Sequence, residues 1–214
     1  MKKITKQNPP ASFLSWRDGG NPDWRPAYSD LSGPPKADLH EALLREQGYI
    51  CCYCGMGIAR EDSHIEHLVP QHLNESLALD YNNLLASCLR RTVKTQPCHC
   101  GVLKGGWYDS ALMVSPLSDD CEGRFRFDAY GAIAAHDDTD SGARETICRL
   151  GLNIDKLIAF RRKAIEGYLD ILDSISSADL QKLVASLERK DTKETNGAFV
   201  PFCFAIAQVL RTLI

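Results

Sequence analysis

Two groups of cysteines constrain this 214-residue chain more than any other feature of its sequence. Cys51 and Cys54 form a Cys-x-x-Cys pair followed by glycine, and Cys88, Cys98 and Cys100 lie further along the chain. A two-residue spacer lets both thiolates of such a pair face one ion, and the glycine permits the turn between them. Four sulfurs from the two groups can close a tetrahedral zinc site. We therefore expect a structural zinc ion on Cys51, Cys54, Cys88 and Cys100.

The second group holds one cysteine more than such a site needs, so Cys98 remains an alternative to Cys88 or Cys100. The chain has nine cysteines, an odd number. Clustered cysteines in a chain without a secretory signal more often bind metal than form disulfides. No apolar run follows the amino-terminal lysines, and no stretch reaches the roughly 18 to 20 apolar residues that span a bilayer. We expect a cytoplasmic protein without a membrane segment.

Composition and periodicity divide the chain into four segments of different character. The first holds six of the ten prolines, which disfavours helix. The cysteine region has too few apolar residues for a core of its own, so a bound metal would supply part of its stability. The predicted fold class is α+β. The segments are an extended Pro/Trp-rich arm (residues 1–36), a zinc-stapled module that opens with a helix (37–108), a hairpin and connector (109–150) and a carboxy-terminal helical bundle (151–214).

An acid-histidine motif, His64-Ile65-Glu66-His67, lies between the two cysteine groups. Its period-two alternation predicts a strand with Glu66 and His67 on opposite faces. A carboxylate can hold a hard divalent cation, and a neutral imidazole can take a proton from water at cellular pH. His64 shares the Glu66 face, and three roles stay open for it: a metal ligand, a phosphate contact or a surface residue.

The order of these motifs resembles that of the HNH endonucleases, whose catalytic module has the ββα-metal fold. This sequence contains CYCG, HIEHLVP, YNNLLASC and HCGVLKG in that order. The resemblance implies a hydrolase that cuts phosphodiester bonds in nucleic acid. It assigns His67 as general base, Glu66 as a ligand of a catalytic divalent ion such as Mg²⁺, and Asn83 as the residue that braces the loop and orients the histidine.

One position departs from the family pattern. Many HNH proteins carry a metal-binding residue three positions before the motif lysine, and here that position, counted back from Lys104, is Gly101. We expect either His99 or water to complete the shell of the catalytic ion.

Outside the motif, the chain resembles the PtuB-like HNH subunits of Septu-type and retron-associated antiphage defence systems. The similarity includes Pro9-Pro10 with Trp16 near the start, the stretch from Ser115 to Phe125, and the helical tail. It implies a complex with a PtuA-like ATPase and, in retron versions, with a reverse transcriptase and its RNA–DNA hybrid. The aromatic residues of the arm and of the tail around Phe199–Phe204 are candidate docking surfaces for such a partner.

Nucleic-acid binding must be local in this chain, because its net charge is −3 and its pI is about 6.1. A predicted phosphate-binding rim beside the acid-histidine motif consists of Arg90, Arg91, Lys94 and Lys104. The alternative is that these cations form an ordinary solvated surface without a binding role. Double-stranded DNA is the default substrate of the family, and structured RNA such as tRNA stays open.

The competing hypothesis is a non-catalytic zinc module that binds nucleic acid or protein. It accounts for the cysteines and the cations. It does not account for the occurrence of Glu66-His67 and Asn83 at nuclease spacing, so we favour the enzyme.

Overall fold

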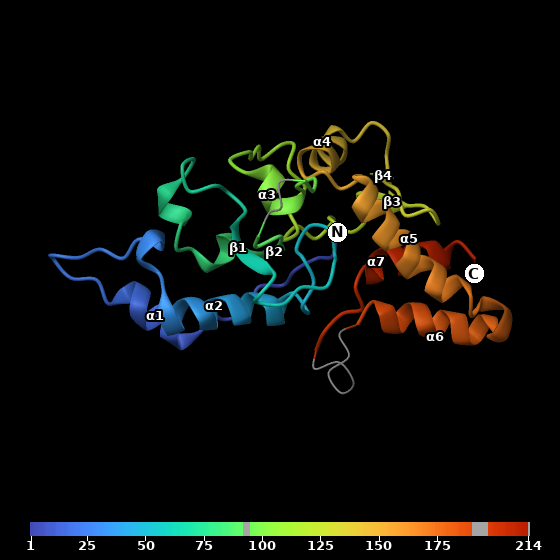
Figure 1. Ribbon diagram of the computed structural model, residues 1–214, viewed down its shortest axis with the longest axis horizontal. Helices are drawn as coiled ribbons and strands as arrows, with labels where there is room; N and C mark the ends of the chain where they lie inside the picture. Colours follow the sequence, from blue (N-terminus) through green and yellow to red (C-terminus); the bar gives the residue numbers. More distant parts are fainter. Residues whose placement is uncertain (92–94, 190–196, 214) are drawn as a thin grey trace.

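The computed structural model describes residues 1–91, 95–189 and 197–213, and the predicted contact Lys94 lies outside them. The fold is α+β, as predicted, with two separate antiparallel pairs of strands among helices (Figure 1). The strands are β1 (Ser63–His67), β2 (Leu84–Cys88), β3 (Phe125–Phe127) and β4 (Ile133–Ala135).

The helices α1 and α2 lie at one end of the molecule and α5, α6 and α7 at the other, with β1, β2, α3 and α4 between them (Figure 1). The helices are α1 (Ala11–Asp18), α2 (Gly33–Glu46), α3 (Cys100–Lys104), α4 (Ser141–Arg149), α5 (Asp155–Leu169), α6 (Ser177–Leu187) and α7 (Cys203–Arg211). Four single-turn 3₁₀ segments connect them: η1 (Tyr28–Asp30), η2 (Glu75–Leu77), η3 (Tyr81–Asn83) and η4 (Leu172–Ser174).

The first 36 residues are not the extended arm that their prolines predicted. They contain α1, and α2 begins inside them at Gly33. Pro10 lies directly before α1, and two further prolines lie in the first turn of α2. Proline is tolerated at these positions because the first backbone N–H groups of a helix have no intrahelical acceptor. Phe13 of α1 is fully buried, so this segment belongs to the core.

The central strands and α3 follow one another in the order ββα. In β1 and β2, Glu66 pairs with Leu85 and His67 with Leu84. The buried side chain of Gln47, just after α2, donates to the Ala86 carbonyl and accepts from the Ala86 amide. This two-way link fixes the end of α2 against the middle of β2.

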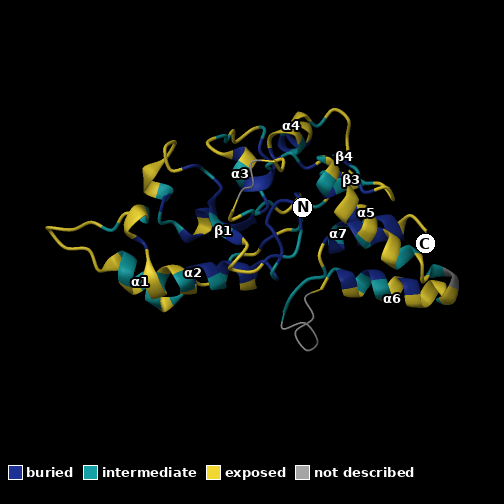
Figure 2. Cartoon of the chain, in the orientation of Figure 1, coloured by how far each residue is buried: buried dark blue, intermediate teal, exposed yellow. Residues whose placement is uncertain are grey.

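Two hydrophobic clusters stabilise the molecule. The larger contains the amino-terminal helices, the cysteine region and the β3–β4 hairpin, and the smaller lies among α5, α6 and α7. Figure 2 shows buried residues through the centre of the chain and exposed ones on the connecting loops. The predicted hairpin and helical bundle are therefore confirmed. The Ser176 side chain caps α6, and α4 was not predicted.

The tail before α7 packs back onto the cysteine region. A Cβ atom at Gly48 would lie 2.5 Å from the Phe199 ring, and one at Gly55 would lie 2.3 Å from the Phe204 ring. Phe202 is buried in the chain, while Phe199 and Phe204 are half-buried against the cysteine region, and docking of a partner on this tail stays a prediction. No helix within the described ranges combines the length and apolar character needed to cross a bilayer.

Candidate metal centre and adjoining acid-histidine site

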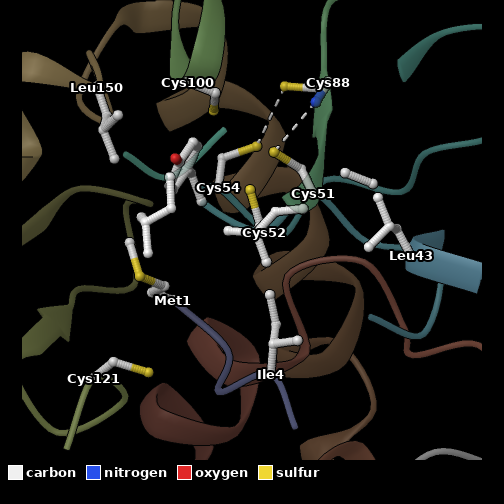
Figure 3. Close-up of a cluster of buried hydrophobic side chains, with 14 of the residues drawn as sticks. Met1, Ile4, Leu43, Cys51, Cys52, Cys54, Cys88, Cys100, Cys121 and Leu150 are labelled. Carbon is white, nitrogen blue, oxygen red and sulfur yellow. Dashed lines mark hydrogen bonds between the residues drawn. The ribbon is translucent and has the colours of Figure 1, made fainter. Parts of the chain in front are cut away.

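The four predicted zinc ligands converge on one point (Figure 3). Their Sγ atoms all lie within 4.8 Å of one another, and all four residues are buried. They are Cys51 and Cys54 from the loop after α2, Cys88 at the end of β2 and Cys100 at the start of α3. Four sulfurs at this spacing suit a single tetrahedral ion, so the chain has a Cys₄ cluster that could hold zinc.

The backbone around the first pair has the form that such a site requires. Gly55 has a φ of +77°, the left-handed region that glycine adopts without strain. The Cys88 amide donates to the Cys51 sulfur at 3.4 Å, and the Cys54 and Cys88 sulfurs are 3.9 Å apart (Figure 3). Cys98 is half-exposed and is not a member of the cluster, which removes it as an alternative ligand.

The thiol pKa values within the cluster diverge. Burial acts to raise the pKa of Cys51, but hydrogen bonds from Cys100 and its other neighbours outweigh burial and the pKa is lowered. Burial and the same hydrogen bonds raise the pKa of Cys100. Four adjacent thiolates repel one another, so without a cation only part of the set can ionise. A divalent ion would offset part of this negative charge and allow all four thiols to ionise, so the donor set fits zinc.

A buried arginine adds positive charge beside the cluster. Arg161 of α5 is 1% exposed, and its guanidinium donates to the carbonyls of Gly131 and Leu152. Burial lowers its pKa to about 10, and the charges of Cys54 and Cys100 oppose this shift. The guanidinium stays charged at neutral pH and can offset the excess negative charge that four thiolates keep after binding one divalent ion.

Glu66 on β1 has two carboxylate oxygens in different surroundings. Its Oε1 lies 2.8 Å from the Lys104 ammonium of α3 and accepts a hydrogen bond from the Tyr53 hydroxyl at 3.2 Å. Its Oε2 faces the His64 Nε2 at 3.4 Å. Burial acts to raise the Glu66 pKa, but the hydrogen bond from His64 and the charge of Lys104 outweigh it and lower the pKa. Glu66 is therefore an ionised carboxylate with one oxygen held by the protein.

His67 is held with one ring nitrogen bonded and the other available. Its Nε2 donates to the Ala78 carbonyl at 3.0 Å, which fixes the proton of the neutral ring on Nε2 and leaves the Nδ1 lone pair available. The Tyr28 ring contacts the imidazole edge-on, with centroids 4.4 Å apart. Burial lowers the His67 pKa. The imidazole is thus neutral at cellular pH and can accept a proton.

Asn83 braces the loop that carries this hydrogen bond. Its side-chain oxygen accepts from the Val69 amide at 2.8 Å, and its side-chain nitrogen donates to the carbonyls of Val69 and Leu77. Leu77 immediately precedes Ala78, the acceptor for His67. Asn83 therefore braces the loop whose Ala78 carbonyl accepts the hydrogen bond from His67.

His99 lies against the sulfurs of the cysteine cluster. Its Nδ1 is 3.2 Å from the Cys100 sulfur and 3.6 Å from the Cys88 sulfur. The ring is fully buried, and among the described residues its Nε2 has no hydrogen-bond partner. This position makes His99 a neighbour of the Cys₄ cluster.

Gly101 and His64 lie directly against Glu66. A Cβ atom at Gly101 would be 2.4 Å from Glu66 Oε2 and 2.9 Å from His64 Nε2. The backbone of α3 thus packs directly against a carboxylate oxygen and an imidazole nitrogen. This pair of donors could bind a divalent cation such as Mn²⁺, whereas Mg²⁺ prefers oxygen ligands alone.

The predicted phosphate rim is only partly at the surface. Arg90 and Arg91 are both exposed, and the Arg90 guanidinium donates to the Arg60 carbonyl. Lys104, in contrast, has a side chain that is 1% exposed, and its ammonium binds Glu66 and the His67 carbonyl. This corrects the assignment of Lys104 to the rim, because a buried, paired ammonium positions Glu66 and does not face solvent.

The sequence analysis did not identify Tyr53 and Tyr28 as members of the site. Tyr53 lies between Cys52 and Cys54, and the sequence pattern there indicates only a metal site. Tyr28 comes from η1, in a segment without any motif, and reaches His67 only through the tertiary fold.

A scan against models of protein families finds no match for this chain, and a comparison with curated proteins finds none either.

Proposed function

We propose that this protein is a metal-dependent HNH-type endonuclease that hydrolyses phosphodiester bonds in nucleic acid. One observation carries the proposal: adjacent residues of β1 offer an ionised carboxylate and a neutral, oriented imidazole beside a Cys₄ cluster. Glu66 has one oxygen that faces His64, and His67 has its Nδ1 lone pair available. A non-catalytic zinc module would not require this combination.

The protein's own groups can provide the proton transfers and the positioning. His67 takes a proton from the attacking water at Nδ1, while the Ala78 carbonyl holds the opposite nitrogen and stabilises the imidazolium that forms. Asn83 keeps that carbonyl in place. A depressed His67 pKa keeps the base unprotonated at cellular pH, although it also limits the strength of the base.

Glu66 is the residue that would hold the catalytic divalent ion. Lys104 and Tyr53 fix its orientation by binding Oε1, so Oε2 stays directed toward His64. A bound Mg²⁺ supplies Lewis-acid stabilisation of charge that develops on the phosphate oxygens. Zinc on the cysteines would be structural, because a site closed by four sulfurs leaves no position for substrate.

The wider assignment also belongs to this proposal. The enzyme is the effector subunit of an antiphage defence complex with a PtuA-like ATPase and, in a retron setting, a reverse transcriptase with its RNA–DNA hybrid. Arg91 and Arg90 contact phosphates near the start of β1. The substrate is DNA by default, with structured RNA such as tRNA as the other class to assay.

The test is cleavage of plasmid DNA and of total RNA, with Mg²⁺ or EDTA, by the protein alone and together with the ATPase encoded beside it. We expect His67→Ala to abolish cleavage and to leave the melting temperature nearly unchanged, because the ring contributes one hydrogen bond and one aromatic contact. The matched control is His136→Ala, at an exposed histidine outside the site. Equal cleavage by the wild type and His67→Ala would refute the proposal.

A further inference from the structure

We infer that His64 is the second protein ligand of the catalytic divalent ion and replaces the helix-borne ligand that Gly101 cannot supply. The inference rests on the proposed function, since it names the residues that hold the ion of that reaction. It assigns the ion to two residues of a single strand, His64 and Glu66, which are separated by one position.

The distance between the two donor atoms supports shared coordination. His64 Nε2 and Glu66 Oε2 lie 3.4 Å apart. Two ligands with bonds of about 2.1 Å to one ion are separated by about 3.0 Å at 90° and about 3.4 Å at 110°. The Glu66 oxygen on this side is also the one that Lys104 and Tyr53 leave available. The pair can therefore bind an ion without moving either side chain far.

The exposure of the two side chains is also suitable. The Glu66 side chain is 8% exposed and the His64 side chain is 28% exposed. An ion can thus enter from solvent past the imidazole and reach a carboxylate that the protein holds rigidly. Solvent on the His64 side leaves room for water and a substrate phosphate to complete the shell, as hard cations require.

The position on α3 that the family pattern uses, Gly101, has no side chain that could bind the ion. Any side chain at 101 would begin 2.4 Å from Glu66 Oε2, inside the space that an ion bound there would occupy. The Nδ1 of His99 faces the sulfurs of Cys88 and Cys100. The absence of a side chain at Gly101 thus leaves space for the His64 imidazole to approach the Glu66 carboxylate.

The experiment uses the full-length, zinc-loaded protein with Mn²⁺ as the probe. Titration followed by electron paramagnetic resonance gives the Mn²⁺ affinity, and pulsed measurements detect the ¹⁴N nucleus of a coordinated imidazole. We expect one Mn²⁺ per chain with a nitrogen signal in the wild type. His64→Ala should lose that signal and bind Mn²⁺ about 10-fold more weakly or worse. His67→Ala and the control His136→Ala should keep both properties.

A second variant tests whether the space beside Gly101 is needed for Mn²⁺ binding, and it keeps the His64 imidazole. Gly101→Ala should favour the helix by its propensity, yet its methyl group would displace Glu66 Oε2 and His64 Nε2, so we expect weaker Mn²⁺ binding at full zinc content. A nitrogen signal that persists in His64→Ala, or Mn²⁺ affinity unchanged in both variants, would overturn the inference.

The two proposals fail in different ways. If the wild type cuts nucleic acid but His64→Ala binds Mn²⁺ as the wild type does, the ligand assignment is wrong and the nuclease proposal is unaffected. If Mn²⁺ binds through His64 but His67→Ala cuts as fast as the wild type, the assigned nuclease mechanism is wrong and the ligand assignment stands.

Discussion

Asn83 braces the loop that holds His67, although the two side chains do not share a hydrogen bond. The Asn83 amide binds the loop backbone at Val69 and Leu77, and the carbonyl of Ala78, the next residue, accepts the hydrogen bond from His67 Nε2. The Val69 amide, the Val69 carbonyl and the Leu77 carbonyl lie outside the strands of the described chain. The buried Asn83 side chain therefore supplies the hydrogen bonds that a neighbouring strand would otherwise provide.

We expect Asn83→Ala to lower the free energy of unfolding by about 2 kcal/mol, because it leaves three backbone groups without this partner. Under the proposed function, it should also slow cleavage strongly, since the Ala78 carbonyl is then free to shift. The neighbouring Asn82→Ala is the control, because Asn82 is exposed and contacts Asp80. Urea unfolding and cleavage rates that match in the two variants would contradict the bracing role.

His40 makes stability depend on pH. It is 7% exposed, its Nε2 lies 2.9 Å from the Ser63 hydroxyl, and burial together with the charge of Arg90 lowers its pKa from 6.5 to about 4. The unfolded chain thus binds this proton at a higher pH than the folded chain. The stability contributed by neutral His40 is complete above pH 6.5 and is lost as the pH falls toward 4.

We therefore expect the free energy of unfolding of the wild type to fall relative to that of His40→Asn as the pH is lowered from 7 to 5. The slope is at most about 1.4 kcal/mol per pH unit. Thermal unfolding of both proteins across this range measures the difference, and any acid effect on the zinc site is common to both. A difference that is independent of pH would show that His40 titrates normally.

At the scale of elements, the Cys₄ cluster joins three pieces that are each too short to be stable alone. α3 has five residues and β2 has five, and isolated helices below about 12 residues are marginal in water. Cys100 opens α3, and Cys88 closes β2. A shared ion therefore provides the tertiary contact that these elements need.

Cys54→Ser should release zinc and unfold the cysteine region, since metal binding of this type is worth of order 10 kcal/mol and whole domains are stable by about 5 to 15 kcal/mol. Cys148→Ser is the matched control because Cys148 is exposed and outside the cluster. Zinc analysis and far-UV circular dichroism of both variants decide the matter. Normal folding and full zinc content in Cys54→Ser would refute the structural role.

The elements near the motifs were predictable because their signals are local. The Cys-x-x-Cys turn, the alternating strand at His64–His67 and the helical periodicity of the last third depend on neighbours in sequence. The role of Lys104 was not predictable, because a buried lysine and an exposed one have the same local sequence. The same holds for the Tyr28 contact to His67, which arises from segments brought together by the fold.

At the scale of the whole molecule, the tail and the cysteine region support each other. Phe204 of α7 lies against Gly55 of the cysteine turn and also contacts Phe127 of β3. Gln208 extends this contact by accepting from the Phe127 amide and donating to the Phe125 carbonyl. The helical bundle is thus joined to the metal module by packing and by hydrogen bonds.

We expect Phe204→Ala to destabilise the protein by about 2 to 4 kcal/mol and to speed the loss of zinc to a chelator, because the cavity lies against the turn that carries Cys54. Phe160→Ala is the control, since Phe160 is 42% exposed on α5. The measurement is the rate of zinc transfer to a coloured chelator. If both variants release zinc at the wild-type rate, the tail does not stabilise the metal module.

Cys100 and Lys104 stand four residues apart in α3, so one turn of helix joins the Cys₄ cluster to the Glu66 carboxylate. Thiolate oxidation would release an ion held by these sulfurs, and α3 would then lose its anchor. Lys104 would move away from Glu66, and a buried carboxylate would be left without its counter-charge. The oxidation state of the four thiols would in this way change the surroundings of Glu66 on β1, and a reductant together with fresh zinc would restore them.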